Sequence, residues 1–258
     1  MVALQRTRNR VVASAAIVAE AAADGVTRLP VLRSQAPLVL RRTPDAVYVV
    51  GGAAGPIGGD ALEMSIVVRE GASLRVRTAA AAVALPGPDG QESVLALTAT
   101  VDAGARLEYL PEPVVVSAGA RHATVIRVTL AEGASLVLRD QLILGRHGED
   151  GGASRTSLRV DYAGHPLLRQ SVEVSGTDRV SMGPAILAGH RAVGTLLVVD
   201  PAQQDASTLN ETPDREPGVA IMPLAGPGIL VTAVAHDAVT LCRRLTWAQS
   251  TGTSPRRN

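Results

Sequence analysis

Residues 47–82 read VYVVGGAAGPIGGDALEMSIVVREGASLRVRTAAAA, and this stretch decides the fold of the chain. Two apolar, strand-like runs flank a glycine-rich turn that ends in Gly58-Gly59-Asp60. A second turn, Glu70-Gly71-Ala72, leads into a run in which apolar and polar residues alternate. Alternation with a period of two is typical of a half-buried strand. The stretch therefore predicts strands joined by tight turns.

The second of these turns recurs twice downstream. Each copy is a strand, then Gly-Ala-x-Leu, then another strand, with the turn glycines at Gly71, Gly104 and Gly133. Glycine supplies the positive φ that a tight turn needs, and the leucine after it is well placed to enter a core. Repeats at this spacing predict stacked β-units. We expect a mainly β protein, an irregular multi-stranded β-sandwich or β-helix-like scaffold of stacked hairpin units, with one or two helices.

The clearest helix is predicted at the C-terminus. Apolar residues there follow the i, i+3, i+4, i+7 spacing of one helix face, namely Ala238, Leu241, Cys242 and Leu245. Asp237 is placed to cap the helix N-terminus. Residues 183–199 mix small and apolar residues, a pattern compatible with a helix followed by a strand.

The chain length suits one large domain. We expect a single domain over residues 1–250 and a disordered tail over residues 251–258. Residues 11–20 alternate imperfectly, so their periodicity fits either a strand or a helix. Residues 200–218 are polar and proline-rich and predict a loop.

Composition excludes several classes of function. All 25 basic residues are arginine, so Schiff-base chemistry and a phosphate-loop lysine are ruled out. The net charge is +1 and aromatic residues are scarce, which argues against a nucleic-acid partner. No apolar run approaches the ~20 residues of a membrane span. A single cysteine, Cys242, excludes internal disulfides and favours a reducing, cytoplasmic location.

The glycine-rich turn at Gly58-Gly59 invites a phosphate-binding interpretation. That interpretation needs a helix after the glycines, or a lysine, and the sequence supplies neither. Asp60, directly after the two glycines, is suited to bond local backbone N–H groups and tie down the turn.

The five histidines show no metal-ligand spacing, and Cys242 has no second cysteine nearby. His147 lies with Glu149 and Asp150 in a polar, glycine-rich loop that we expect to be flexible. This loop is either simply solvated or a transient site for a divalent ion. No Gly-x-Ser-x-Gly motif is present.

Several motifs, in a fixed order, resemble the urease accessory protein family called UreD or UreH, in its divergent actinobacterial form. They are Gly25-Val26-Thr27-Arg28-Leu29, Gly58-Gly59-Asp60-x-Leu62, Leu107-Glu108-Tyr109-Leu110-Pro111-Glu112-Pro113, Gly119-Ala120-Arg121, Gly145-Arg146-x-Gly148-Glu149 and the His-Pro-Leu-Leu-Arg run at 165–169. The chain departs from the family pattern in two places. A Gln and a Lys are missing from the alanine segment after Thr78, and glycine replaces the aromatic residue expected after Glu149.

The resemblance implies a non-enzymatic scaffold and metallochaperone. Family members bind apo-urease, recruit UreF and the GTPase UreG, and help deliver nickel through an internal passage. On this basis Asp60 and Glu149 are candidate carboxylates lining the passage, with His147 a weaker candidate. Oxygen ligands suit an ion that must be released again. No tightly bound cofactor is implied, only nickel in transit.

Two other functions remain open from the residues alone. One is a β-sandwich hydrolase with its site in the 145–152 loop. The other is a structural β-repeat protein that serves only protein interactions.

Overall fold

The Gly-Ala-x-Leu repeat forms three stacked turns, seen in a computed structural model that describes residues 10–201 and 217–253. The glycines Gly71, Gly104 and Gly133 adopt φ values of +68°, +64° and +76°. The next residue, an alanine, is buried and donates its N–H to a carbonyl three residues earlier. The leucine that follows is at most 5% exposed in every copy. Each repeat therefore encodes a turn and a core contact together.

Every turn carries the chain from one sheet to the other. Sheet A comprises β1 (Val12–Ala21), β2 (Thr27–Arg33), β5 (Ala61–Val68), β8 (Glu92–Val101), β11 (Arg121–Leu130), β13 (Ala153–Tyr162) and β14 (His165–Ser175). Their order is β14-β13-β11-β8-β5-β1-β2. The five inner strands run parallel, and the edge strands β2 and β14 are antiparallel to their neighbours.

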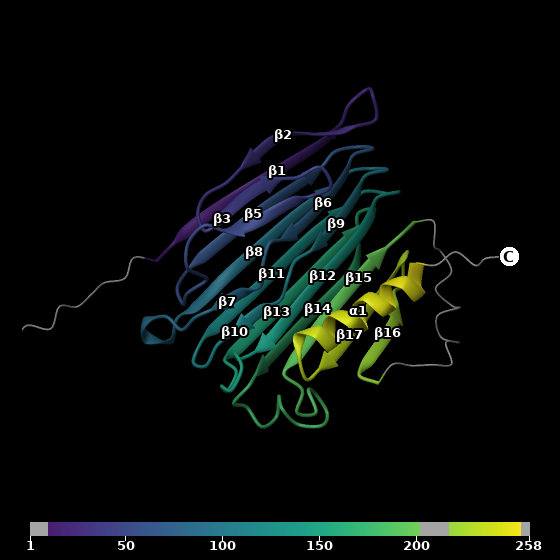
Figure 1. Cartoon of the computed structure of the whole chain (residues 1–258). Coiled ribbons are helices and arrows are strands. Elements are labelled where there is room, and N and C mark those ends of the chain that lie inside the picture. Colours follow the sequence, from purple (N-terminus) through teal and green to yellow (C-terminus); the bar gives the residue numbers. More distant parts are fainter. Residues whose placement is uncertain (1–9, 202–216, 254–258) are drawn as a thin grey trace, which may run out of the picture.

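Sheet B faces sheet A across the core (Figure 1). It comprises β3 (Leu38–Arg42), β4 (Val47–Gly51), β6 (Ser73–Thr78), β7 (Ala82–Ala84), β9 (Arg106–Leu110), β10 (Val114–Val116), β12 (Ser135–Leu144), β15 (Ala192–Val199), β16 (Val219–Pro223) and β17 (Gly228–Ala235). Its main order is β16-β17-β15-β12-β9-β6-β4-β3, while β10 pairs with β12 and β7. The strands β4, β6, β9 and β12 are parallel.

The expected mainly β, β-helix-like architecture is confirmed, but the hairpin form of its units is wrong. The two strands of a repeat do not pair with each other. Instead β5 pairs with β8 and β6 with β9, each in the neighbouring unit. Both strands of a unit turn their apolar faces toward the shared core, so their hydrogen-bonding edges point to the next unit. A true hairpin occurs at β13–β14, which turn about Gly164.

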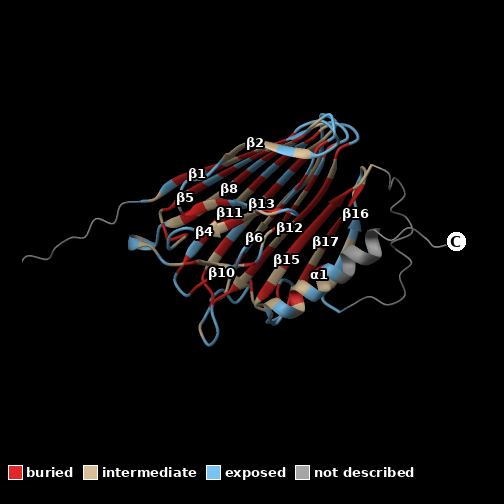
Figure 2. Ribbon diagram, turned by 45° about the horizontal axis from the view of Figure 1, so that its top comes forward, coloured by how far each residue is buried: buried red, intermediate tan, exposed pale blue. Residues whose placement is uncertain are grey.

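The core lies between the sheets, where buried and exposed residues alternate along the strands (Figure 2). Large buried side chains fill it, among them Ile17, Ile66, Leu107, Ile126, Leu136 and Leu158. The ambiguous stretch 11–20 belongs to this core, because β1 is a strand whose alternate residues are buried.

The helix α1 (Ala238–Thr253) covers the outer face of sheet B over β15 and β17 (Figure 1). Its Leu241 and Leu245 are buried against those strands. Gly194 on β15 makes this approach possible, because a Cβ there would lie 2.7 Å from Leu245 Cδ1.

The helix considered for 183–199 is absent, and that expectation was wrong. The chain before β15 consists of turns, in which Gly183-Pro184 interrupts any helical pattern. Asp178 organises these turns by accepting hydrogen bonds from Ser181 N and Oγ at 2.9 and 2.7 Å. The C-terminal helix is confirmed and reaches Thr253, three residues into the expected tail. Residues 254–258, and 202–216 of the predicted loop, lie outside the described residues.

Candidate functional site

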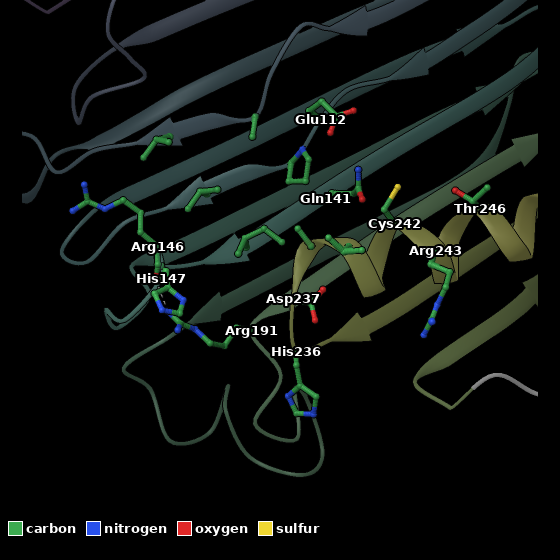
Figure 3. A pocket seen from close by; sticks show the side chains of 18 residues that line it. Glu112, Gln141, Arg146, His147, Arg191, His236, Asp237, Cys242, Arg243 and Thr246 are labelled. Atoms are coloured by element: carbon green, nitrogen blue, oxygen red, sulfur yellow. Dashed lines mark hydrogen bonds between the residues drawn. The ribbon is translucent and has the colours of Figure 1, made fainter.

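A groove lies between α1, the loop after β12 and the outer face of sheet B (Figure 3). Its volume is about 1100 Å³. Its floor is formed by the apolar side chains of Val83 on β7, Val115 on β10 and Ile143 on β12, with Ala81 just before β7. Glu112, Arg146 and His147 are among the polar side chains around it. The groove is thus an apolar hollow with charged groups at its margins.

The start of α1 fixes one wall of the groove. The carboxylate of Asp237 accepts hydrogen bonds from Thr240 N at 2.8 Å and Thr240 Oγ1 at 3.1 Å. These bonds satisfy a free donor of the first helical turn and lower the pKa of Asp237. The predicted cap is therefore confirmed, and it places Cys242 on the groove side of the helix (Figure 3).

The opposite wall is the loop of residues 145–152, and it is well anchored rather than free. Arg146 donates from its backbone N and from Nε to Glu149 Oε1, both at 2.9 Å, and from Nη2 to Oε2. Arg191 donates to the carbonyls of Leu144, Arg146 and Glu149. The bonds from Arg146 lower the pKa of Glu149 to about 2.

A small cavity with a mainly apolar lining lies between the two sheets, next to the groove. Its volume is about 70 Å³, and Thr124 and Asp140 are among the residues that line it. Glu112 and Gln141 line both this cavity and the groove. The two spaces therefore share a wall made of polar side chains.

Asp140 on β12 points across the gap toward sheet A. Its Oδ2 accepts a hydrogen bond from Thr156 Oγ1 at 3.2 Å, and no cation is paired with it among the described residues. Removal from bulk water raises the pKa of Asp140 to about 6, against the lowering effect of the Thr156 bond. Asp140 is not fully buried, and we attribute its accessible surface to the cavity that it lines.

Polar residues continue from the cavity along the inner face of sheet A. His122 is 1% exposed; its Nδ1 lies 2.9 Å from Ser93 Oγ and its Nε2 3.4 Å from Thr124 Oγ1. Burial lowers the pKa of His122 to about 4, so the ring is neutral at pH 7. Ser154 stands next to His122 in register on β13, and its Oγ has no partner among the described residues.

Ser154 also lines a cleft of about 410 Å³ at the outer face of sheet A, together with Glu92, Arg121 and Arg155. We call this the exit cleft. Polar side chains that are neighbours by hydrogen bond, by strand register or by a shared cavity wall thus lie between the groove and the exit cleft. We call this set the polar crossing: Glu112, Gln141, Asp140, Thr124, Thr156, His122 and Ser154.

Comparison with known proteins gives the family of the chain. The family model described as UreD urease accessory protein matches residues 12–253. The chain belongs to the UreD family.

Relatives at high identity cover most of it. A urease accessory protein UreD of Parafrankia sp. (strain EAN1pec) is 43% identical over 264 residues, covering 93% of this chain and 88% of the relative. UreD 3 of Streptomyces griseus is 49% identical over 226 residues, covering 83% and 86%. UreD of Streptomyces coelicolor is 44% identical over 246 residues, covering 90% and 93%. The resemblance inferred from the sequence motifs is confirmed.

The motif residues of this UreD-family chain fall into different places. Glu112, Pro113 and Arg146 meet at the groove. Arg121 lines the exit cleft. Arg28 is exposed and pairs with Asp24 at 3.1 Å. Three of the five family-motif residues therefore converge on one hollow, the consecutive Glu112 and Pro113 from one segment and Arg146 from another.

The candidate metal residues are not brought together. Asp60 is 4% exposed, and its two oxygens accept hydrogen bonds from Val11 N at 3.0 Å and Ile57 N at 2.9 Å. It ties the glycine-rich turn to the start of β1, as the capping interpretation expected. Glu149 is bound by Arg146, and only His147 reaches the groove. Within residues 10–201 and 217–253, no three His, Cys, Asp or Glu side chains gather as a metal site.

The two turn glycines before Asp60 serve close packing. A Cβ on Gly58 would lie 2.3 Å from Gln91 O, and Gly59 has φ +94°.

The described helix α1 lacks the length and apolar character needed to cross a bilayer, and the other described segments contain no such helix.

Sequence reasoning missed Asp140 and His122. A usable signal existed: Arg139-Asp140-Gln141 interrupts an otherwise apolar ten-residue strand, SLVLRDQLIL. Inside a buried strand, three adjacent polar residues need partners on both faces.

Proposed function

We propose that this chain is a urease maturation factor, a scaffold without enzymatic activity that binds apo-urease. With UreF and the GTPase UreG, it passes nickel to the urease active site through the polar crossing. Its membership of the UreD family supports the role in maturation. Its single cysteine is in keeping with a cytoplasmic location, where thiols remain reduced.

The polar crossing is the observation that carries the nickel proposal. A buried carboxylate without a cationic partner is costly, and an amide of the same shape would avoid that cost. Asp140 is partly buried between the sheets without a cationic partner, and at pH 7 it is mostly ionised because its pKa is about 6. A cation in transit supplies the missing charge. The ionised Asp140 thus destabilises the chain when no ion is bound, and for the same reason it attracts a nickel ion.

The ligands along the route suit transfer better than storage. Carboxylate, amide and hydroxyl oxygens hold a divalent ion weakly, and the neutral imidazole of His122 offers nitrogen. No point of the route gathers three strong ligands within the described chain. The cavity of about 70 Å³ has room for a few water molecules, and therefore for part of a hydration shell.

The experiment co-expresses the chain with urease, UreF and UreG and measures nickel per urease active site. Asp140→Asn and Glu112→Gln keep the shape of each side chain and remove its charge. We expect both to lower nickel loading while the complex still assembles, as followed by size-exclusion chromatography.

Matched controls are Asp102→Asn and Glu132→Gln, which make the same changes in the turns between sheets. These controls should load nickel like the wild type. Wild-type loading by Asp140→Asn would contradict passage through the polar crossing. Failure of the wild-type chain to bind or activate urease would contradict the maturation role itself.

A hydrolase site in the 145–152 loop gains no support. The loop contains no serine or cysteine, and Arg146 occupies its Glu149 carboxylate.

A further inference from the structure

A row of arginines crosses the outer face of sheet A, which α1 leaves bare. Strand register places one residue from each of seven strands side by side: Arg33, Ala16, Ser65, Thr98, Arg127, Arg159 and Arg169. All four arginines of this set are exposed. We call the four the arginine row.

Two members of the row are direct neighbours without a counter-charge. Arg127 and Arg159 are paired in register on adjacent strands, which lie about 4.8 Å apart. Like charges placed opposite each other in a sheet are destabilising. Neighbouring arginines are neutralised within the chain: Arg169 pairs with Asp161 and Arg155 with Glu92. No carboxylate lies within ion-pair distance of Arg127 or Arg159 among the described residues.

The surface beside this pair is open to close approach. The residues between Arg33 and Arg127 have short side chains, and they leave a hollow of about 600 Å³. Ser65 and Thr98 are exposed there and offer hydroxyl groups. One acidic side chain, Glu63, also lines the hollow. A partner can thus reach the strands themselves while its carboxylates meet the guanidinium groups.

The position of the row relative to the polar crossing indicates which partner it fits. The exit cleft includes Arg155, which lies on the same strand as Arg159 and on the same face. Four residues of strand span about 13 Å. The groove, at the other end of the polar crossing, lies on the opposite sheet. A protein that accepts the ion at the exit cleft would therefore lie next to the arginine row on the same face.

We propose that the arginine row docks a carboxylate-bearing surface of apo-urease, with Arg127 and Arg159 as the central contacts. This inference rests on the proposed function and adds the docking face to it. Guanidinium groups pair with carboxylates through two parallel hydrogen bonds, so exposed Asp and Glu side chains of a partner fit these two arginines. A nucleic acid fits less well, because the hollow contains Glu63 and the face offers no exposed aromatic platform.

The test measures the Kd of the purified chain for purified apo-urease at low and at physiological salt. Arg127→Glu/Arg159→Glu should weaken binding by about tenfold or more at low salt and reduce the salt dependence. Arg127→Gln/Arg159→Gln should give a smaller loss. The control Arg41→Glu/Arg42→Glu makes the same charge change on β3, at the edge of sheet B and away from the exit cleft. It should bind like the wild type.

Each outcome is decisive. Wild-type affinity in both double variants would overturn the docking face, and if wild-type chain still activates urease, the maturation role stands. An effect of the substitutions only on self-association, or only on binding to a DNA oligonucleotide, would equally overturn it. Absence of binding by the wild-type chain would remove the proposed function and this inference together.

Discussion

Thr156 Oγ1 donates a hydrogen bond of 3.2 Å to Asp140 Oδ2 and so joins sheet A to sheet B through the core. A neutral hydroxyl is the only hydrogen-bond donor that the described residues offer this carboxylate. As a consequence, the pKa of Asp140 is raised to about 6, and its ionised form destabilises the fold.

Asp140→Asn should stabilise the free chain at neutral pH. The folded pKa of Asp140 lies about 2 units above its ordinary value of 3.8, which corresponds to ~3 kcal/mol when the group is ionised. The favourable contribution of the protonated acid is complete below pH ~4 and is lost as the pH rises through ~6. Urea unfolding should therefore show the variant more stable at pH ~8 and equal to the wild type near pH ~4. Equal stability at both values would contradict the buried charge.

His122→Gln should change the pH dependence in the opposite direction. The folded pKa of His122, about 4, lies below its ordinary 6.5, so the folded state resists protonation. Its contribution is present above pH ~6.5 and is lost as the pH falls through ~4. Between these values the effects of Asp140 and His122 oppose each other. Relative to the wild type, the glutamine variant should gain stability on acidification, whereas Asp140→Asn should lose it.

Gly194→Ala should loosen α1 from sheet B. The added methyl would lie 2.7 Å from Leu245 Cδ1, closer than packed atoms allow, and at a tight 3.2 Å from Leu241 Cδ1. Overpacking of this kind costs about 1–3 kcal/mol. Gly51→Ala is the matched control, because nothing lies within 4 Å of its Cβ position and its φ is not positive. Thermal unfolding that ranks the two variants equally would contradict the close contact.

Asp60→Ala separates two hypotheses for that carboxylate. Because its oxygens bind Val11 N and Ile57 N, the variant leaves two donors unpaired and should be destabilised by about 2–4 kcal/mol. Nickel loading of urease per folded molecule should stay unchanged. A variant that unfolds like the wild type but loads less nickel would instead favour the role in metal passage suggested by the sequence.

Arg191→Ala should release the 145–152 loop. Its guanidinium group donates to the carbonyls of Arg146 and Glu149 in the loop and of Leu144 just before it, and no other side chain replaces those contacts within the described residues. Amide hydrogen exchange of the loop should accelerate, while exchange in β11 and β12 stays slow. Arg155→Ala is a suitable control, because its guanidinium group donates to Glu92 on another strand and not to this loop.

The local features of this fold could be read from the sequence, whereas the strand partners could not. Gly71 and its two equivalents identify turns because a positive φ is a local requirement. Which strand pairs with β5 depends on contacts between units about thirty residues apart. The alternation of apolar and polar residues fits a strand in a hairpin and a strand in one coil of a β-helix equally well. The turns before β15 were misjudged because small apolar residues fit a helix as well as irregular chain.

The site shows the same division. Glu112 and Arg146 were singled out by motif, and both lie at the groove. Asp60 and Glu149 also come from family motifs, as candidate carboxylates of the passage, but their oxygens are bound by the Ile57 N–H and by Arg146. Asp140 and His122 acquire their meaning only when β12 faces β11 and β13 across the core. The environments of these two side chains depend on which strands face each other in the tertiary structure, and the sequence pattern does not predict this.

The three stacked Gly-Ala-x-Leu turns have an evolutionary consequence. Each turn begins a coil that contacts mainly the coils before and after it, so a whole coil can be duplicated or deleted without a change in the geometry of the others. Gain or loss of one coil would shift α1 relative to β1 by one strand spacing, about 4.8 Å. Homologues that differ by one such coil would hold their two ends at distances that differ by that fixed step.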